Sequence, residues 1–106
     1  MKRLKYIFYF YCLFIVFINT AHSENYSLEK AFDGLNRPWG MSFIDDHNLL
    51  VTQKSGEILK INLKTQEKIE LDHNLKVLEV GWQGGMLDVL FHEGMVYVSY
   101  TEKRYG

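Results

Sequence analysis

The sequence predicts an all-β protein built from repeated units of short antiparallel strands, and three observations support this fold class. Apolar and polar residues alternate with a period of two, most clearly over 57–63. Turn-forming clusters such as Asp45-Asp46-His47-Asn48 separate these runs. A Gly-Met pair at 40–41 recurs 45 residues later, and Val51-Thr52 is echoed 47 residues later by Val98-Ser99. This spacing is typical of β-propeller blades.

Each expected strand is a short apolar run bounded by turn residues. The strands expected for the two units are 39–44, 49–53, 57–63, 67–71, 86–91 and 95–100. We also expect a lead-in strand over 26–32, a turn at Asp33-Gly34, and an extended segment up to Pro38, because proline biases the residue before it away from helical geometry. The first unit is then a complete four-stranded blade.

The second unit supplies only two of four strands. A closed propeller needs roughly four to eight blades, and each blade buries its apolar face on a neighbour. We therefore expect these 106 residues to be the first blade and half of the second, the amino-terminal piece of a longer protein. The alternative is a small exported β-sheet protein, which predicts cooperative unfolding of the mature chain alone.

The first 23 residues resemble a signal peptide. The chain opens with three basic residues: Lys2, Arg3 and Lys5. An apolar core follows over 6–18, and Ala21-His22-Ser23 is a small-x-small cleavage site. The apolar run is shorter than the ~20 residues of a spanning helix, which favours cleavage over a permanent anchor. We expect a signal peptide over 1–23, a propeller domain over 24–106, and a periplasmic or secreted location.

Composition excludes several function classes for the mature part. It carries nine basic and thirteen acidic residues, a net charge of −4, so it has no basic stripe of the kind that binds nucleic acid. Cys12, the only cysteine, lies in the predicted signal segment. The mature chain therefore has no disulfide, no thiol nucleophile and no cysteine metal site. The three histidines of the mature part, His47, His73 and His92, have no partner residues at metal-ligand spacing.

Four segments in order resemble the start of the soluble quinoprotein sugar dehydrogenases, the glucose/sorbosone and aldose sugar dehydrogenase family. They are LNRPW at 35–39, LLVTQKSGEILKI at 49–61, GWQGGMLDVLFH at 81–92 and VYVSYTEK at 96–103. The most specific is Gln83-Gly84-Gly85 followed by Met86-Leu87-Asp88, which is similar to the family's Gly-Gln-x-Gly-Leu-Leu run. Family members are six-bladed propellers that use pyrroloquinoline quinone (PQQ) and calcium.

The sequence also departs from the family pattern. Gln53-Lys54 stands where members commonly have Glu-Arg, and Trp82 replaces the glycine before the glutamine. After His92, Glu93-Gly94 replaces the usual Pro-Asp-Phe loop. We interpret these differences as loop variation that leaves the substrate preference open.

The resemblance implies oxidation of the C1 hydroxyl of an aldose sugar. A histidine base takes the hydroxyl proton, hydride passes to PQQ, calcium polarises the quinone oxygens, and an electron acceptor reoxidises the cofactor. The family's base, arginines and calcium ligands fall beyond the second blade. We therefore expect no catalytic and no metal-binding residue in these 106 residues, assign no cofactor-binding residue, and expect the chain alone to be inactive.

Two residues are expected to bind the substrate. Gln83 lies in the loop that feeds an inner strand, and its amide offers two donors and an acceptor for a sugar hydroxyl; the resemblance implies contact with the sugar near the quinone. The alternative is that Gln83 satisfies loop carbonyls. Trp39 could form an aromatic wall for a sugar face, or could be core.

Three neighbours carry weaker expectations. Trp82 divides between rim contact and packing, and Asp88 is expected to bond to neighbouring backbone within an apolar strand. Lys54 could offer charge to a quinone carboxylate, but we expect a solvated turn lysine. A competing class for the whole chain is a non-catalytic secreted propeller that binds a protein or a glycan, because a fold does not fix the chemistry. Sequence beyond Gly106 would separate the two by the presence of a catalytic histidine loop.

Overall fold

The computed structural model describes residues 24–103, and this part of the chain contains six β-strands and no helix. The strands are β1 (Pro38–Phe43), β2 (Asn48–Gln53), β3 (Ile58–Asn62), β4 (Glu67–Leu71), β5 (Met86–His92) and β6 (Met95–Tyr100). Accordingly, no helix in this part is long and apolar enough to cross a bilayer. The predicted signal peptide lies outside the described residues, so export stays a prediction.

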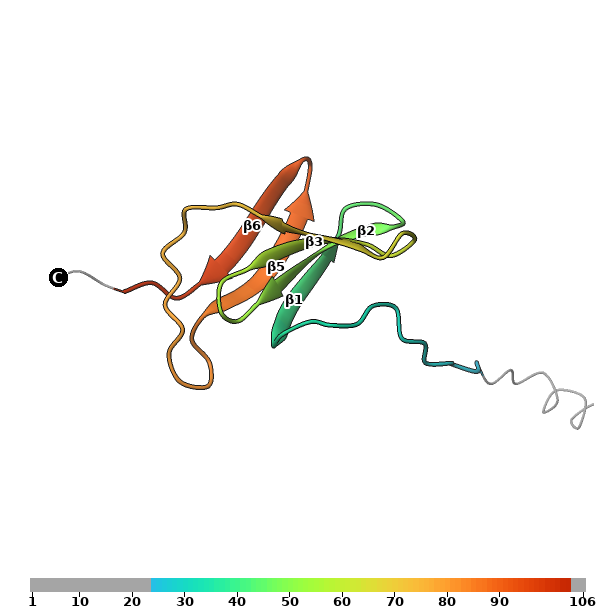
Figure 1. Ribbon diagram of the computed structural model, residues 1–106, viewed down its shortest axis with the longest axis horizontal. Helices are drawn as coiled ribbons and strands as arrows, with labels where there is room; N and C mark the ends of the chain where they lie inside the picture. The colour runs from blue at the N-terminus through green and yellow to red at the C-terminus, as the bar shows by residue number, and fades with distance from the viewer. Residues whose placement is uncertain (1–23, 104–106) are drawn as a thin grey trace, which may run out of the picture.

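The strands form two antiparallel sheets. β1 to β4 make a four-stranded sheet in chain order, and β5 and β6 make a separate hairpin that lies against it (Figure 1). All six strands predicted from the alternation are present, and those at 67–71 and 95–100 match to the residue. The expected all-β fold, one blade followed by half of a second, is therefore confirmed for its strands and their order.

The two blades pack through a shared apolar layer. Period-two alternation sends Leu50 and Ile58 to one face of the first sheet, where they meet Met86 and Val89 of β5. Met86 is fully buried. Burial of one such side chain contributes about 1.5–3 kcal/mol, so this layer fixes where β5 begins relative to the first blade.

The opposite face of the first sheet is apolar but only partly covered. Its buried residues are Leu49, Val51, Leu59 and Ile61, and the packed neighbours are Phe32, Leu35 and Leu63. Along β1, Trp39, Met41 and Phe43 lie about half exposed. Such a face is what a blade presents to a neighbouring blade in a propeller.

Two expectations for the segment before β1 are wrong. Residues 26–32 form no strand, and Tyr26 and Leu28 are exposed. Arg37 is not extended but has a φ of 46°. Its carbonyl accepts the N–H of Lys54 at 3.0 Å and its guanidinium pairs with Glu79. These contacts offset a left-handed conformation that costs about 1–2 kcal/mol.

The repeat is real, but its structural offset differs from that of the Gly-Met pairs. In β1 and in β5 one extra residue interrupts the pairing with the neighbouring strand, which makes a β-bulge. Just after it, Met41 pairs with Val51 in the first blade, and Val89 pairs with Val98 in the second. The equivalent residues of β1 and β5 are therefore 48 positions apart in the sequence, and those of β2 and β6 are 47 positions apart. Gly85-Met86 is not equivalent to the earlier Gly-Met pair, which was a wrong match.

Candidate functional site

The loop that carries Gln83 lies at the same end of the strands as the turn that carries Lys54. The N–H of Met86, at the start of β5, donates to the Lys54 carbonyl at 3.0 Å. The N–H of Lys54 in turn donates to Arg37, just before β1. Figure 1 shows the long crossover from β4 returning along this end before β5 begins. The Gln83 loop and the Lys54 turn are therefore in direct contact.

Gln83 is exposed in a turn over 81–83. Among residues 24–103, no group forms a hydrogen bond with its side-chain amide. In the alternative interpretation Gln83 satisfies loop carbonyls, but the two loop carbonyls just before it, those of Gly81 and Trp82, are bonded by Lys54. The Gln83 amide is thus available to a ligand.

Lys54 is not the solvated turn lysine that the sequence suggested. Only 9% of its surface is exposed, and its Nζ donates to the carbonyls of Gly81 and Trp82 at 2.8 Å each. No sequence pattern indicates this role, because the acceptors lie 27 and 28 residues away in an irregular loop. The side chain is committed to the loop beside Gln83.

The glycine pair after Gln83 is required by backbone contacts. A Cβ on Gly84 would lie 2.5 Å from the Val80 carbonyl oxygen, and one on Gly85 would lie 2.3 Å from that of Lys54. Gly85 also has a φ of 139°, a conformation that side chains disfavour. Both glycines therefore allow a close approach of the loop to the protein's own backbone.

Trp39 lies on the partly covered face of the first sheet. It is 51% exposed and lines a largely apolar hollow of 470 Å³ together with Met41 and Phe43. Gln83 and Trp82 do not line this hollow. Trp82 is almost fully exposed, so it is not a packing residue within the described part. Trp39 and Gln83 are thus near the same end of the strands but not in one pocket.

Asp88 is exposed rather than buried within β5. It occupies the bulge, which turns its side chain out of the apolar layer. Its Oδ1 accepts the N–H of Val89 at 2.8 Å, as expected for a carboxylate bonded to neighbouring backbone. A Cβ on Gly40 would lie 2.5 Å from this carboxylate oxygen, so glycine at that position lets β1 and β5 come together.

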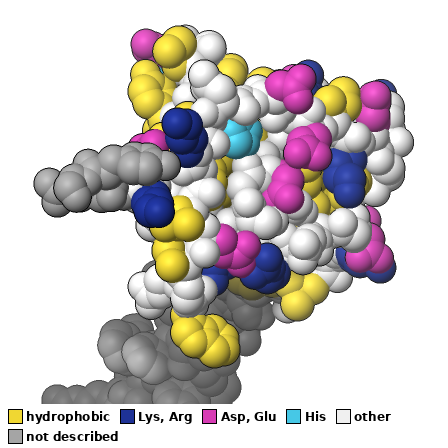
Figure 2. All heavy atoms as spheres, turned by 60° about the vertical axis from the view of Figure 1, so that its left-hand side comes forward, with side chains coloured by type: hydrophobic (Ala, Val, Ile, Leu, Met, Phe, Trp, Pro, Cys, Tyr) yellow, Lys and Arg dark blue, Asp and Glu magenta, His cyan; other side chains and the backbone are white. Residues whose placement is uncertain are grey.

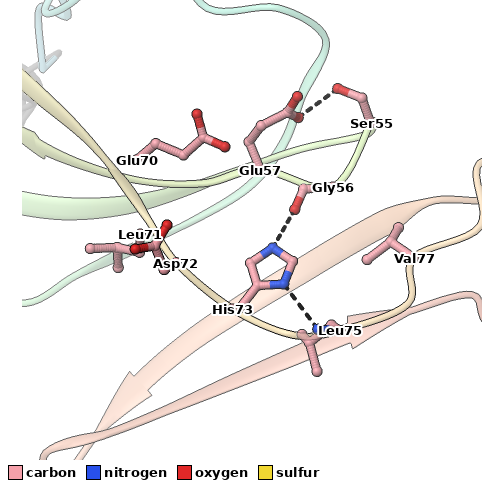
Figure 3. A pocket seen from close by; sticks show the side chains of 9 residues that line it. All are labelled: Ser55, Gly56, Glu57, Glu70, Leu71, Asp72, His73, Leu75 and Val77. Carbon is pink, nitrogen blue, oxygen red and sulfur yellow. Dashed lines mark hydrogen bonds between the residues drawn. The ribbon is translucent and has the colours of Figure 1, made fainter.

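A second, polar hollow of 330 Å³ lies beside the β2–β3 turn (Figure 3). His73 Nε2 lies 2.6 Å from the Gly56 carbonyl, and its Nδ1 accepts the N–H of Leu75. The Ser55 hydroxyl donates to Glu57 at 2.5 Å and lowers the pKa of that carboxyl. These side chains fasten the crossover to the first blade. In residues 24–103, no group of three or more His, Cys, Asp or Glu side chains could hold a metal ion.

Surface charge does not favour a polyanion ligand. Figure 2 shows acidic and basic side chains interspersed over one face of the protein. The exposed Arg37 is paired with Glu79. Interspersed charge of both signs gives no extended positive field.

Comparison with known proteins identifies the class. Residues 35–106 match the family described as Glucose / Sorbosone dehydrogenase, and the chain belongs to this family. It is similar to a PQQ-bound aldose sugar dehydrogenase from Streptomyces coelicolor, with 31% identity and a TM-score of 0.63 over 71% of this chain. It covers 24% of that protein, about a quarter of its length. A search of curated protein sequences finds no significant match.

The described residues do not by themselves fit PQQ. The cofactor in this family presents carboxylates, which need cations, but Lys54 donates to two backbone carbonyls and Arg37 is paired with Glu79. Among residues 24–103, the neutral side-chain amide of Gln83 at this end of the blades is exposed and forms no hydrogen bond with a described group. A neutral amide suits a sugar hydroxyl better than a quinone carboxylate.

Proposed function

We propose that this chain is the opening part of an exported PQQ-dependent sugar dehydrogenase that oxidises the C1 hydroxyl of aldoses, and that Gln83 binds the sugar. Membership of the glucose/sorbosone dehydrogenase family supports the reaction class. The observation that carries the role of Gln83 is its exposed amide, which has no hydrogen-bond partner among residues 24–103 and sits beside a fixed glycine turn.

In this proposal the first blade and the start of the second contribute binding and not chemistry. The sugar contact proposed here is that of Gln83, whose amide donates to and accepts from sugar hydroxyls, because Trp39 lines a separate hollow that Gln83 does not reach. PQQ and calcium are held by residues outside the described part, and a separate electron acceptor receives the electrons. Residues 1–23 direct the protein to the periplasm or the exterior.

A dye-reduction assay tests the reaction class. The full gene product, supplied with PQQ and Ca²⁺, should reduce an artificial acceptor when D-glucose or another aldose is added. The 106-residue chain, treated identically, should show no aldose-dependent reduction. Activity of the 106 residues alone would contradict the division of labour. A full product that is inactive with every aldose but retains binding to glycans would favour the non-catalytic alternative.

Variants of the full product test Gln83. Gln83→Ala should raise the KM for the aldose by about tenfold, because one or two hydrogen bonds worth about 0.5–1.5 kcal/mol each are lost. Asn74→Ala is the matched control, since Asn74 is an exposed amide in the same crossover. An unchanged KM for Gln83→Ala would remove Gln83 from the sugar site without affecting the reaction class.

A further inference from the structure

We propose that Lys54 is a positioning residue that sets the orientation of the Gln83 loop, and hence of the sugar-binding amide. The role of the loop in sugar binding rests on the function proposed above, whereas the fixing of the loop by Lys54 stands on geometry alone. The departure from the family's usual Glu-Arg pair at 53–54 falls at this residue.

The side chain of Lys54 forms hydrogen bonds with the loop immediately before Gln83. Its ammonium donates to the carbonyls of Gly81 and Trp82, both at 2.8 Å, so the two peptide units that precede Gln83 turn their oxygens toward one cation. Carbonyl dipoles that converge in this way repel each other unless a positive charge lies between them. Charge-assisted bonds of this kind are about twice as strong as neutral ones.

The backbone of Lys54 holds the other end of the same loop. Its carbonyl accepts the Met86 N–H at 3.0 Å, and Gly85 lies so close that a Cβ there would be 2.3 Å from this oxygen. One residue therefore contacts the loop on both sides of Gln83. Two more hydrogen bonds hold the loop: the Gly84 N–H donates to the Val80 carbonyl within it, and the Gly85 N–H donates to the hydroxyl of Thr101, just after β6.

Lys54 is itself anchored, so that it can act as a fixed point. It is buried, and its N–H donates to the carbonyl of Arg37 at 3.0 Å. The adjacent Gln53 Oε1 accepts the Asn36 N–H at 2.8 Å. The first blade thus presents a rigid cation to a loop that has no strand or helix of its own over 81–85. A preordered loop loses less conformational freedom when a ligand binds.

Amide hydrogen exchange of the exported protein tests the positioning step without any ligand. In Lys54→Met, the amides of Gly84, Gly85 and Met86 should exchange at least about tenfold faster, because two charge-assisted bonds are lost. The strand amides of Leu50 and Ile61 should keep their wild-type rates. Lys54→Arg retains a cation with several donors and should restore loop protection to within about threefold.

The controls separate positioning from general stability. Lys60→Met removes an exposed strand lysine and should change no loop amide. If Lys54→Met does not fold, Lys54→Gln, which keeps a neutral donor, should give the same loop-specific change. Loop amides that stay protected in the neutral variants would overturn the proposal. So would equal acceleration of loop and strand amides, because that is the signature of a merely structural lysine.

A titration with D-glucose tests the link to binding. The titration follows the NMR resonance of the Gln83 side-chain amide. In Lys54→Met the midpoint of this titration should move to an about tenfold higher D-glucose concentration, and in Lys54→Arg it should return to the wild-type value. A wild-type Gln83 that does not respond to D-glucose would count against the proposed function, while the exchange data would still decide whether Lys54 fixes the loop. An unchanged titration midpoint in Lys54→Met would show that the order of the loop does not determine the affinity for D-glucose, which would contradict this step of the proposal.

Discussion

The hydroxyl of Thr52 in the first blade donates a hydrogen bond to the carbonyl of Leu87 in the second. The same oxygen accepts the N–H of Gly40 at 3.1 Å, so a single fully buried side chain ties the bulge of its own blade to that of the next. Ser99 occupies the equivalent position in the second blade and accepts the N–H of Asp88 at 3.1 Å. The bulge and its hydroxyl therefore recur together.

Replacing the Thr52 hydroxyl by a methyl group should remove the hydrogen bond between the blades and lower the stability of the protein. Thr52→Val leaves the Gly40 N–H and the Leu87 carbonyl without their partner, and a buried group left in this state costs about 1–3 kcal/mol. The free energy of unfolding in urea should fall by this amount. Ser99→Ala is the matched control: it is exposed and should change stability by less than about 0.5 kcal/mol. Equal effects of the two substitutions would contradict the bridging role of Thr52.

Alanine at Gly85 should destabilise the protein more than alanine at a glycine in open space. Gly85→Ala meets the Lys54 carbonyl oxygen at 2.3 Å and must also hold a φ of 139°, so a loss of about 3 kcal/mol is expected. Gly94 has a φ of 76° with nothing within 4 Å, and Gly94→Ala should cost only about 1 kcal/mol. Thermal or urea unfolding measures both. Equal losses at the two positions would show that the positive φ, and not the contact with Lys54, is the reason for glycine at position 85.

Asp45 should contribute to loss of stability in acid. Its carboxylate accepts the N–H groups of His47 and Asn48, and these bonds hold the pKa of Asp45 below its usual value in the folded protein. A lowered folded-state pKa means that the stabilisation is present above the unfolded-state value and is lost as the pH falls through the folded-state value. Asp45→Asn should flatten this acid limb in urea midpoints measured against pH. Asp46→Asn controls for the change in charge, and an unaltered limb in Asp45→Asn would refute the assignment.

Strand positions could be predicted because they depend on local alternation. The alternation over Leu59-Lys60-Ile61, with turn residues on both sides, predicts a strand and its apolar face. The observed strand β3 has this position and this buried face. The lead-in strand at 26–32 was a wrong prediction, because this segment pairs with neither sheet and leaves Tyr26 and Leu28 exposed. Strand propensity alone does not supply the backbone pairing that a strand needs.

The candidate site could be predicted less well than the strands. Gln83 was found because its motif resembles a family run and stands just before a strand. The role of Lys54 was missed because it depends on the irregular crossover between β4 and β5, and the left-handed Arg37 likewise contacts residues distant in sequence, Lys54 and Glu79. Contacts between distant irregular segments leave no periodic signal in a sequence.

The hydrogen bonds of His73 predict a ring proton on Nε2 and none on Nδ1. The Leu75 N–H points at Nδ1 at 3.2 Å, which requires a lone pair there, so Nε2 must donate to the Gly56 carbonyl at 2.6 Å. ¹⁵N shifts of the ring should report this tautomer. His73→Ala should speed exchange of the Leu75 amide by about fivefold to tenfold, since a neutral bond is worth about 1 kcal/mol. His73→Asn retains an acceptor near the Nδ1 position and should preserve most of the protection. His47→Ala, at the far end of the strands, is the control, and a ring protonated on Nδ1 would show that His73 does not fasten the crossover in this way.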